Sequence, residues 1–177
     1  MYSATGRQRG RVLLCYDGSD NARQAVEQAG QLLGGGEAVV LTVWESLGSA
    51  ILRRLPSDKT EIGREASGIA EDVVEELDAS TADAAQAIAS EVAALATSSG
   101  FDARPLSRRA LGRAAERTAV TVWRAVLDVA DEENTELIVL GSRGRSAVKS
   151  MVLGSVSYGV VHNAERPVLI VPPLPQR

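Results

Sequence analysis

The chain has 177 residues and carries 23 acidic against 19 basic side chains, a formal net charge of −4 at pH 7. This length fits one domain with one hydrophobic core, because a domain typically holds about 100–200 residues. The acidic balance argues against a general nucleic-acid-binding protein, which carries a basic excess. The 45% hydrophobic content argues against disorder, and the 3% aromatic content predicts an aliphatic core.

Cysteine and histidine usage excludes two further kinds of site. Cys15 is the only cysteine and His162 the only histidine, which excludes an internal disulfide and a Cys/His zinc site.

No apolar run reaches the roughly 18–20 residues of a membrane-spanning helix, and residues 1–10 hold no apolar signal region. We therefore expect a cytoplasmic protein that binds neither nucleic acid nor membrane. Its expected organisation is a flexible tail at 1–9, one domain over 10–173 and a short tail at 174–177.

The first predicted elements are two buried strands joined by a helix. Arg11–Tyr16 is a short apolar run before an Asp-Gly-Ser turn, typical of a strand buried on both faces. Ser19 or Asp20 is a suitable N-cap for a helix that the glycines at 34–36 end. Ala38–Trp44 is a second apolar run and predicts the next strand.

A long loop and a long helix are predicted for the middle of the chain. Glu45–Ile62 contains proline, glycine and mixed charge, which predicts a loop. Apolar residues from Ile69 to Leu95 then recur with a helical period, so we expect one helix of about 30 residues that ends at Ser99-Gly100. The alternative is two shorter helices, and a capping signature at Asp78–Thr81 marks the position where the long helix would then be split.

The second half continues the alternation of strands and helices. It predicts, in order, a strand, a helix, a strand, a helix and a strand over Phe101–Leu111, Thr121–Asn134, Leu137–Leu140, Ser155–Asn163 and Val168–Val171. Buried strands joined by helices predict an α/β fold, in which an open, doubly wound parallel sheet of five strands carries helices on both faces. The crossovers should be right-handed.

The segment from Gly141 to Ser155 carries the most specific chemical pattern. Gly141 and Gly144 follow the fourth predicted strand, and nine residues later Gly154-Ser155 begins the last helix. Glycines let backbone N–H groups approach a phosphate, and a helix N-terminus carries about half a positive charge. Arg143, Arg145 and Lys149 in the same loop can neutralise phosphate charge. The pattern favours phosphate binding outside the carboxyl ends of the strands, with a plain βα turn as the alternative.

The spacing G-x2-G-x9-G-[S/T] resembles the nucleotide-binding signature of the universal stress protein (UspA-type) family. The flanking segments LIVLGSRGRSAVKSMVLGSVSYGVVHNAERPVLIVPP and RVLLCYDGSDNARQAVEQA resemble the same family, so the likeness spans about residues 10–173. It implies the nucleotide-binding subclass and a Rossmann-like, adenine nucleotide alpha hydrolase-like sheet of order 3-2-1-4-5. It also implies an ATP pocket at the carboxyl edge between the first and fourth strands.

The resemblance further implies roles for particular residues. Asp17 matches the family's acidic residue at the end of the first strand, expected near the ribose and as a ligand of Mg²⁺ on the phosphates. From the residues alone, Asp-Gly-Ser is also an ordinary turn. Val43 matches the position whose backbone reads the adenine edge. The motif's own nucleotide contacts are matched by Leu140, Gly141, Gly144, Gly154, Ser155 and Val156.

Three functions compete at this point. The first, which we favour, is an ATP-binding (or other adenine nucleotide-binding) regulator in the stress response that acts on an unknown protein partner. The second is a weak ATP-hydrolysing or nucleotidyl-transferring enzyme, for which the sole His162 is badly placed as a general base. The third is a nucleotide-free dimeric scaffold. The resemblance implies a homodimer through Val168–Val171, an apolar edge strand that Pro172 and Pro173 would end.

Overall fold

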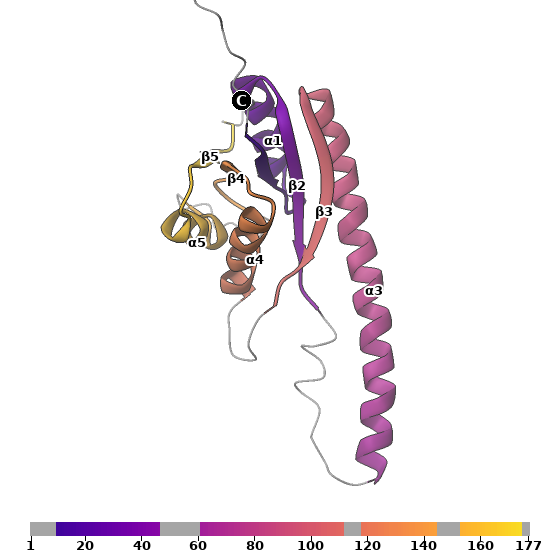
Figure 1. Ribbon diagram of the computed structural model, residues 1–177. Coiled ribbons are helices and arrows are strands. Elements are labelled where there is room, and N and C mark those ends of the chain that lie inside the picture. Colours follow the sequence, from indigo (N-terminus) through magenta and orange to yellow (C-terminus); the bar gives the residue numbers. More distant parts are fainter. Residues whose placement is uncertain (1–9, 47–60, 112–117, 145–152, 175–177) are drawn as a thin grey trace, which may run out of the picture.

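The computed structural model describes residues 10–46, 61–111, 118–144 and 153–174 and contains one parallel five-stranded sheet (Figure 1). Its strand order is β3-β2-β1-β4-β5, as predicted. In chain order the elements are β1 (Val12–Cys15), α1 (Asp20–Leu33), β2 (Gly36–Trp44), α3 (Glu61–Ser98), β3 (Phe101–Arg109), α4 (Thr118–Glu132), β4 (Leu137–Gly141), α5 (Ser155–Asn163) and β5 (Val168–Val171).

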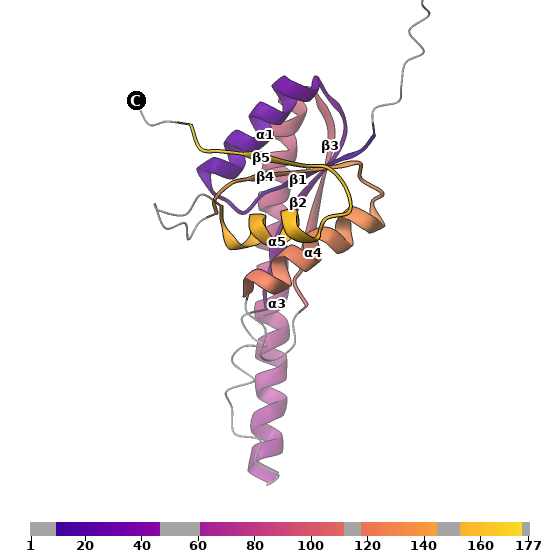
Figure 2. The ribbon, with the colours of Figure 1, turned by 90° about the vertical axis from the view of Figure 1, so that its left-hand side faces the viewer.

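Two aliphatic layers sandwich the sheet, and β1 contributes to both because successive side chains of a strand point to opposite faces. Leu14 packs with Ala25 of α1 and Val92 of α3 on one face. Leu13 packs with Val126 of α4 and other residues on the opposite face. Figure 2 shows α1 on one side of the strands and α4 and α5 on the other. The predicted doubly wound arrangement is therefore confirmed.

The turn after β1 and the end of α1 follow their sequence signals. The side chain of Ser19 caps α1 by accepting a hydrogen bond from the backbone N–H of Ala22 at 3.2 Å. Gly34 ends the helix with φ of 66°, a left-handed conformation that glycine adopts without a Cβ penalty. Its N–H donates to the carbonyl of Gly30 at 2.9 Å. These caps set the direction in which α1 leaves the carboxyl end of β1.

Helix α3 is longer than predicted, with 38 residues from Glu61. The predicted loop overlapped its first two residues, and positions 47–60 of that loop lie outside the described residues. The helix passes through Asp78–Thr81 without a break, and the Thr81 hydroxyl donates to the carbonyl of Leu77 within the helix (2.7 Å) instead of capping a new one. No helix in the described part of the chain, α3 included, is both long and apolar enough to cross a membrane.

Other boundaries differ from the sequence prediction by one to three residues. β3 ends at Arg109, two residues before the predicted end, and α4 begins at Thr118, three residues before the predicted start. Residues 112–117, between these elements, lie outside the described part. The fifth strand and the last helix have the predicted bounds. Apolar periodicity thus located every element, while the ends depend on local contacts.

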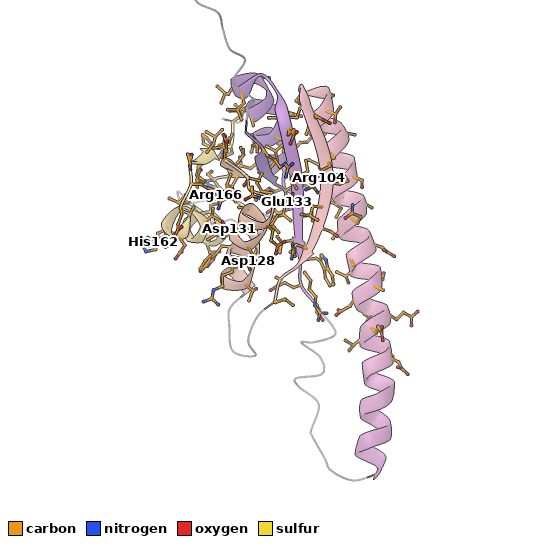
Figure 3. The ribbon with its side chains drawn as sticks, viewed as in Figure 1. Arg104, Asp128, Asp131, Glu133, His162 and Arg166 are labelled. Carbon is orange, nitrogen blue, oxygen red and sulfur yellow. The ribbon has the colours of Figure 1, made fainter. Side chains whose placement is uncertain are left out.

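Arginines hold the C-terminal end of α4. The Arg166 guanidinium donates to the carbonyls of Ala130 at 2.6 Å and Thr135 at 2.8 Å, and it pairs with Asp131 (Figure 3). Arg11 donates to the carbonyl of Glu133 at 2.9 Å. The last carbonyls of a helix lack partners within it and carry partial negative charge, so these cations satisfy and stabilise the helix end. The bonds connect α4 to the segments that precede β1 and β5.

We expect Arg166→Met to lower the free energy of unfolding by about 1–3 kcal/mol, because two backbone carbonyls lose a charged donor. Urea unfolding with linear extrapolation measures this loss. The matched control is Arg23→Met, which breaks an exposed pair with Glu27 on α1 (3.6 Å) and should cost about 0.5 kcal/mol or less. Equal unfolding midpoints for the two variants would contradict a stabilising role of Arg166.

Candidate functional site

A pocket of about 100 Å³, partly open to solvent, lies at the carboxyl ends of β1 and β4. Strands β1, β2 and β4 and helices α1, α4 and α5 all contribute to its wall. The lining residues are Cys15, Tyr16, Asp17, Ala22, Leu41, Val43, Val122, Val126, Leu140, Gly141, Arg143, Gly144, Val156 and Ser157. In open α/β sheets this is the edge where ligands bind.

One side of the pocket is apolar. Leu41 and Val43 reach it from β2, and Val122 and Val126 reach it from α4. Leu41 and Val126 are buried, and Val43 packs against the same core cluster. A wall of branched aliphatic side chains can receive a flat, largely apolar group such as a heterocyclic base. Val43 is the residue that the sequence placed near adenine.

The other side of the pocket is polar and brings the ends of β1 and β4 together. Asp17 accepts a hydrogen bond from the backbone N–H of Ser19 at 3.0 Å through Oδ1. A Cβ placed on Gly144 would lie 2.6 Å from Oδ2 of the same carboxylate, so only glycine fits there without a shift. The acidic turn after β1 and the first glycines after β4 therefore meet in one pocket.

Arg143 places a buried donor at the pocket wall. Its Nε atom is buried and has no hydrogen-bond partner among the described residues. Buried polar atoms are nearly always paired, and leaving a donor unpaired costs about 1–3 kcal/mol. The backbone N–H of Arg143 is held by the Asn21 side chain at 3.0 Å. An anionic ligand in the pocket would supply an acceptor to this guanidinium.

Gly154 and Ser155 lie at the N-terminus of α5, directly before the lining residue Val156. Gly154 is the N-cap, and its N–H donates to the carbonyl of Ser142 at 2.7 Å. A Cβ on Gly154 would lie 3.6 Å from Cα of Arg143, so this residue packs against the loop after β4. Ser155 is exposed. Neither residue is among those that line the pocket, and positions 145–152 of the glycine motif lie outside the described residues.

The buried amide of Asn21 is a site residue that sequence reasoning missed. Its Nδ2 donates to the carbonyl of Val171 at 3.1 Å, and its Oδ1 accepts from the backbone N–H of Arg143. A Cβ on Gly141 would lie 2.9 Å from this Oδ1, which explains why glycine ends β4. An asparagine in the first turn of a helix is ordinary capping chemistry in a sequence, so no local signal revealed this long-range role.

Cys15 lines the pocket and is another residue that sequence reasoning did not assign to the site. It is half-buried at the end of β1, and burial raises the pKa of its thiol far above the usual range, with the negative charge of Asp17 as the second cause. The thiol therefore stays protonated at neutral pH and acts as a small apolar part of the wall. Strand alternation could have indicated this position, because Cys15 shares a face with Leu13.

A metal in this pocket would depend on Asp17. Within the described residues, no group of three or more His, Cys, Asp or Glu side chains could hold a metal ion. Asp17 brings one carboxylate to the pocket, and Mg²⁺ bound to a nucleotide needs only one or two carboxylates besides phosphate and water oxygens. His162 is exposed in the last turn of α5, where its ring stacks on Tyr158 at 5.7 Å, and it does not line the pocket.

Comparison with solved structures finds other proteins that have the same fold. Protein MJ0577 superposes with a TM-score of 0.70 at 19% identity, covering 96% of this chain and 100% of that one. In sequence, the Methanocaldococcus jannaschii protein of this name matches over 46 residues at 35% identity, which is 28% of its length. A universal stress protein solved in complex with cAMP has a TM-score of 0.54 at 23% identity, covering 93% of this chain and 98% of that one.

Sequence comparison identifies the family. A universal stress protein of Thermus aquaticus, encoded in the QAH/OAS sulfhydrylase 3′ region, is 32% identical over 162 residues, covering 90% of this chain and 96% of its own. The sequence model of the universal stress protein family matches residues 8–172. The strand order, the glycine motif at the end of β4 and this match agree, and the chain therefore belongs to the universal stress protein family.

Proposed function

We propose that this protein binds an adenine nucleotide, ATP foremost, in the pocket between β1 and β4 and acts as a homodimeric regulator in the stress response. The observation that carries the proposal is the buried, unpaired Nε of Arg143 in a pocket whose other wall is apolar. A nucleotide has both parts, a base for the apolar wall and phosphates for the guanidinium. The cAMP complex of a protein with the same fold supports this choice.

In this proposal the base lies between β2 and α4. The backbone of Val43 faces the adenine edge, and Leu140 and Val156 flank the base and ribose. The phosphates lie over the glycines that end β4 and begin α5, which have no side chain of their own to keep the phosphates from the backbone. Gly154 and Ser155 contribute the positive end of the α5 dipole, while Gly144 lets the phosphates approach Asp17.

Dimerisation is proposed through β5. This strand is the last in the sheet order and pairs with β4, and Val168, Leu169 and Ile170 along it are half-buried. An apolar edge strand is a template for pairing with another chain, and a two-fold axis would pair it with its own copy. Pro172 and Pro173 follow directly and limit such a ladder, because proline has no N–H to donate.

The first test of the proposed function concerns the binding of the phosphates. In isothermal titration of the full chain, Arg143→Gln should weaken ATP binding by about tenfold or more and leave adenosine binding unchanged, because the guanidinium pairs with phosphate. The matched control is Arg124→Gln, which removes the same charge from beside the Trp123 ring on α4. Absence of ATP binding to the natural chain at about 1 mM would refute nucleotide binding. Equal losses for ATP and adenosine would refute the role of Arg143.

A second prediction concerns the metal. If Asp17 holds Mg²⁺ on the phosphates, ATP affinity of the natural chain should fall when EDTA is added. Asp17→Asn should lower the affinity in Mg²⁺ and abolish the difference between Mg²⁺ and EDTA. The same titrations in Ca²⁺ and Mn²⁺ serve as metal controls. Equal affinities of the natural chain with and without EDTA would remove the metal from the proposal.

The third prediction concerns the assembly. Sedimentation equilibrium at micromolar concentration should give twice the 18.6 kDa chain mass, because the β5 edge is paired in solution. Ile170→Lys, which places a charge within this edge, should shift the mass toward a single chain. Leu32→Lys on the exposed face of α1 should leave the mass unchanged. A single-chain mass for the natural protein would contradict the homodimer.

A further inference from the structure

The N-terminal part of α3 extends beyond the carboxyl edge of the sheet (Figures 1 and 2). The Asp78 carboxylate pairs with Arg109, the last residue of β3, at 3.0 Å between Oδ2 and Nη2. Residues of α3 that precede Asp78 therefore lie past the end of the neighbouring strand. This projecting part stands at the same edge of the sheet as the pocket.

Three large apolar side chains of α3 are exposed on one side of the helix. Val73 is 49% exposed, Leu77 40% and Ile88 37%. They are separated by four and eleven residues, about one and three helical turns, so they share a side. They are distinct from Ala85 and Ala89, which α3 buries against the sheet. We call Val73, Leu77 and Ile88 the apolar stripe.

Acidic residues accompany the apolar stripe. Asp72, Glu76 and Asp83 are separated by four and seven residues, about one and two helical turns, so they share a side of the helix next to the apolar stripe, and all three are exposed. Residues 72–98 contain six acidic side chains and no basic one. The exposed surface of this helix therefore combines apolar contact area with one sign of charge. A surface of this kind favours a partner that presents apolar and basic side chains together.

The base of the projecting part is fixed to the body of the protein. Asp78 is buried, and its partner Arg109 lies over the Trp44 ring at 5.7 Å from the ring centroid. Further along the helix, the Gln86 side chain accepts a hydrogen bond from the backbone N–H of Ser107 on β3 at 3.1 Å. These contacts hold α3 in one direction. A preorganised surface binds its partner more tightly, because less conformational entropy is lost on association.

From these observations we propose that the apolar stripe and its acidic flank dock a basic amphipathic helix of a partner protein. Such a helix lays its apolar side chains against Val73, Leu77 and Ile88 and its Lys and Arg side chains against the acidic flank. A second copy of α3 is a poor occupant, because its own carboxylates would face those of the first copy. The proposal does not depend on nucleotide binding.

The test uses a fluorescent designed peptide of about 18 residues whose leucines form one helical side and whose lysines form the other. Fluorescence anisotropy with the full chain should show saturable binding that weakens as NaCl is raised. Two control peptides define specificity. One replaces every lysine with glutamate, and the other scrambles the order so that no apolar side forms. Binding of either control as tight as that of the designed peptide, or no binding of the designed peptide, overturns the proposal.

Variants of the apolar stripe locate the contact. Val73→Ser/Leu77→Ser should weaken peptide binding by about tenfold or more, because the leucines lose their contact area. The matched control is Leu32→Ser, which removes an exposed leucine from α1. Circular dichroism checks that α3 stays helical, and ATP titration of the double variant should be unchanged. Equal affinities for the double variant and the control overturn the proposal.

Charge variants separate the acidic flank from the general negative charge of the protein. Asp72→Asn/Glu76→Gln/Asp83→Asn should weaken binding by about tenfold or more and flatten its salt dependence. The matched control removes three exposed acids elsewhere, in Asp102→Asn/Asp128→Asn/Glu165→Gln. Equal losses in both triple variants would mean that the peptide responds to net charge alone, which overturns the proposal.

Similar measurements show whether a second copy of the protein or another segment of this chain covers the apolar stripe instead. If Val73→Ser/Leu77→Ser lowers the sedimentation mass of the protein alone, a second copy covers the stripe. Residues 51–59 of this chain also combine apolar side chains with Arg53, Arg54 and Lys59. If Arg53→Ser/Arg54→Ser strengthens peptide binding, this segment of the chain competes for the stripe. Either result overturns the assignment of the stripe to a partner protein, and unchanged values in both experiments support it.

Discussion

The buried amide of Asn21 joins the three segments on which the shape of the pocket depends. It donates to the carbonyl that ends β5 and accepts from the backbone N–H of Arg143 in the loop after β4. Because the amide extends from the first turn of α1, the two strand ends and the helix are fixed relative to one another. The absence of a side chain at Gly141 leaves the room that this amide needs. The Arg143 side chain is consequently carried at the pocket wall with its Nε buried.

The same edge of the sheet serves two surfaces of different chemistry. The pocket between β1 and β4 combines an aliphatic wall with a carboxylate, glycines and a guanidinium, and these groups carry the proposal of nucleotide binding. The projecting part of α3 combines exposed apolar side chains with carboxylates, which is the chemistry of a protein contact. The pair between Asp78 and Arg109 fixes the second surface to the end of β3. A ligand and a partner could therefore be held near each other without sharing residues.

The length of α3 shows why helix boundaries are hard to read from sequence. Its apolar period predicted one helix, and the hydroxyl of Thr81 bonds back to Leu77 inside that helix although the local sequence offered a cap. A capping residue helps only where the chain leaves the helix, and here Asp78 is held by Arg109 from a strand some 30 positions later in the chain. A tertiary ion pair thus accompanies an unbroken helix across a position where local rules favoured an end.

The amino-acid sequence alone determined the order of the elements, the parallel sheet and the edge where Asp17 and Gly144 meet. Short apolar runs, helical periods and glycine spacing are local, and they need no knowledge of distant partners. The family resemblance supplied the strand order. Only the tertiary structure decided the role of Asn21, the place of Cys15 in the pocket wall and the exposure of Val73 and Leu77. Each of these depends on which distant segments lie against the residue, and burial and pairing are properties of that arrangement, which no local window of sequence contains.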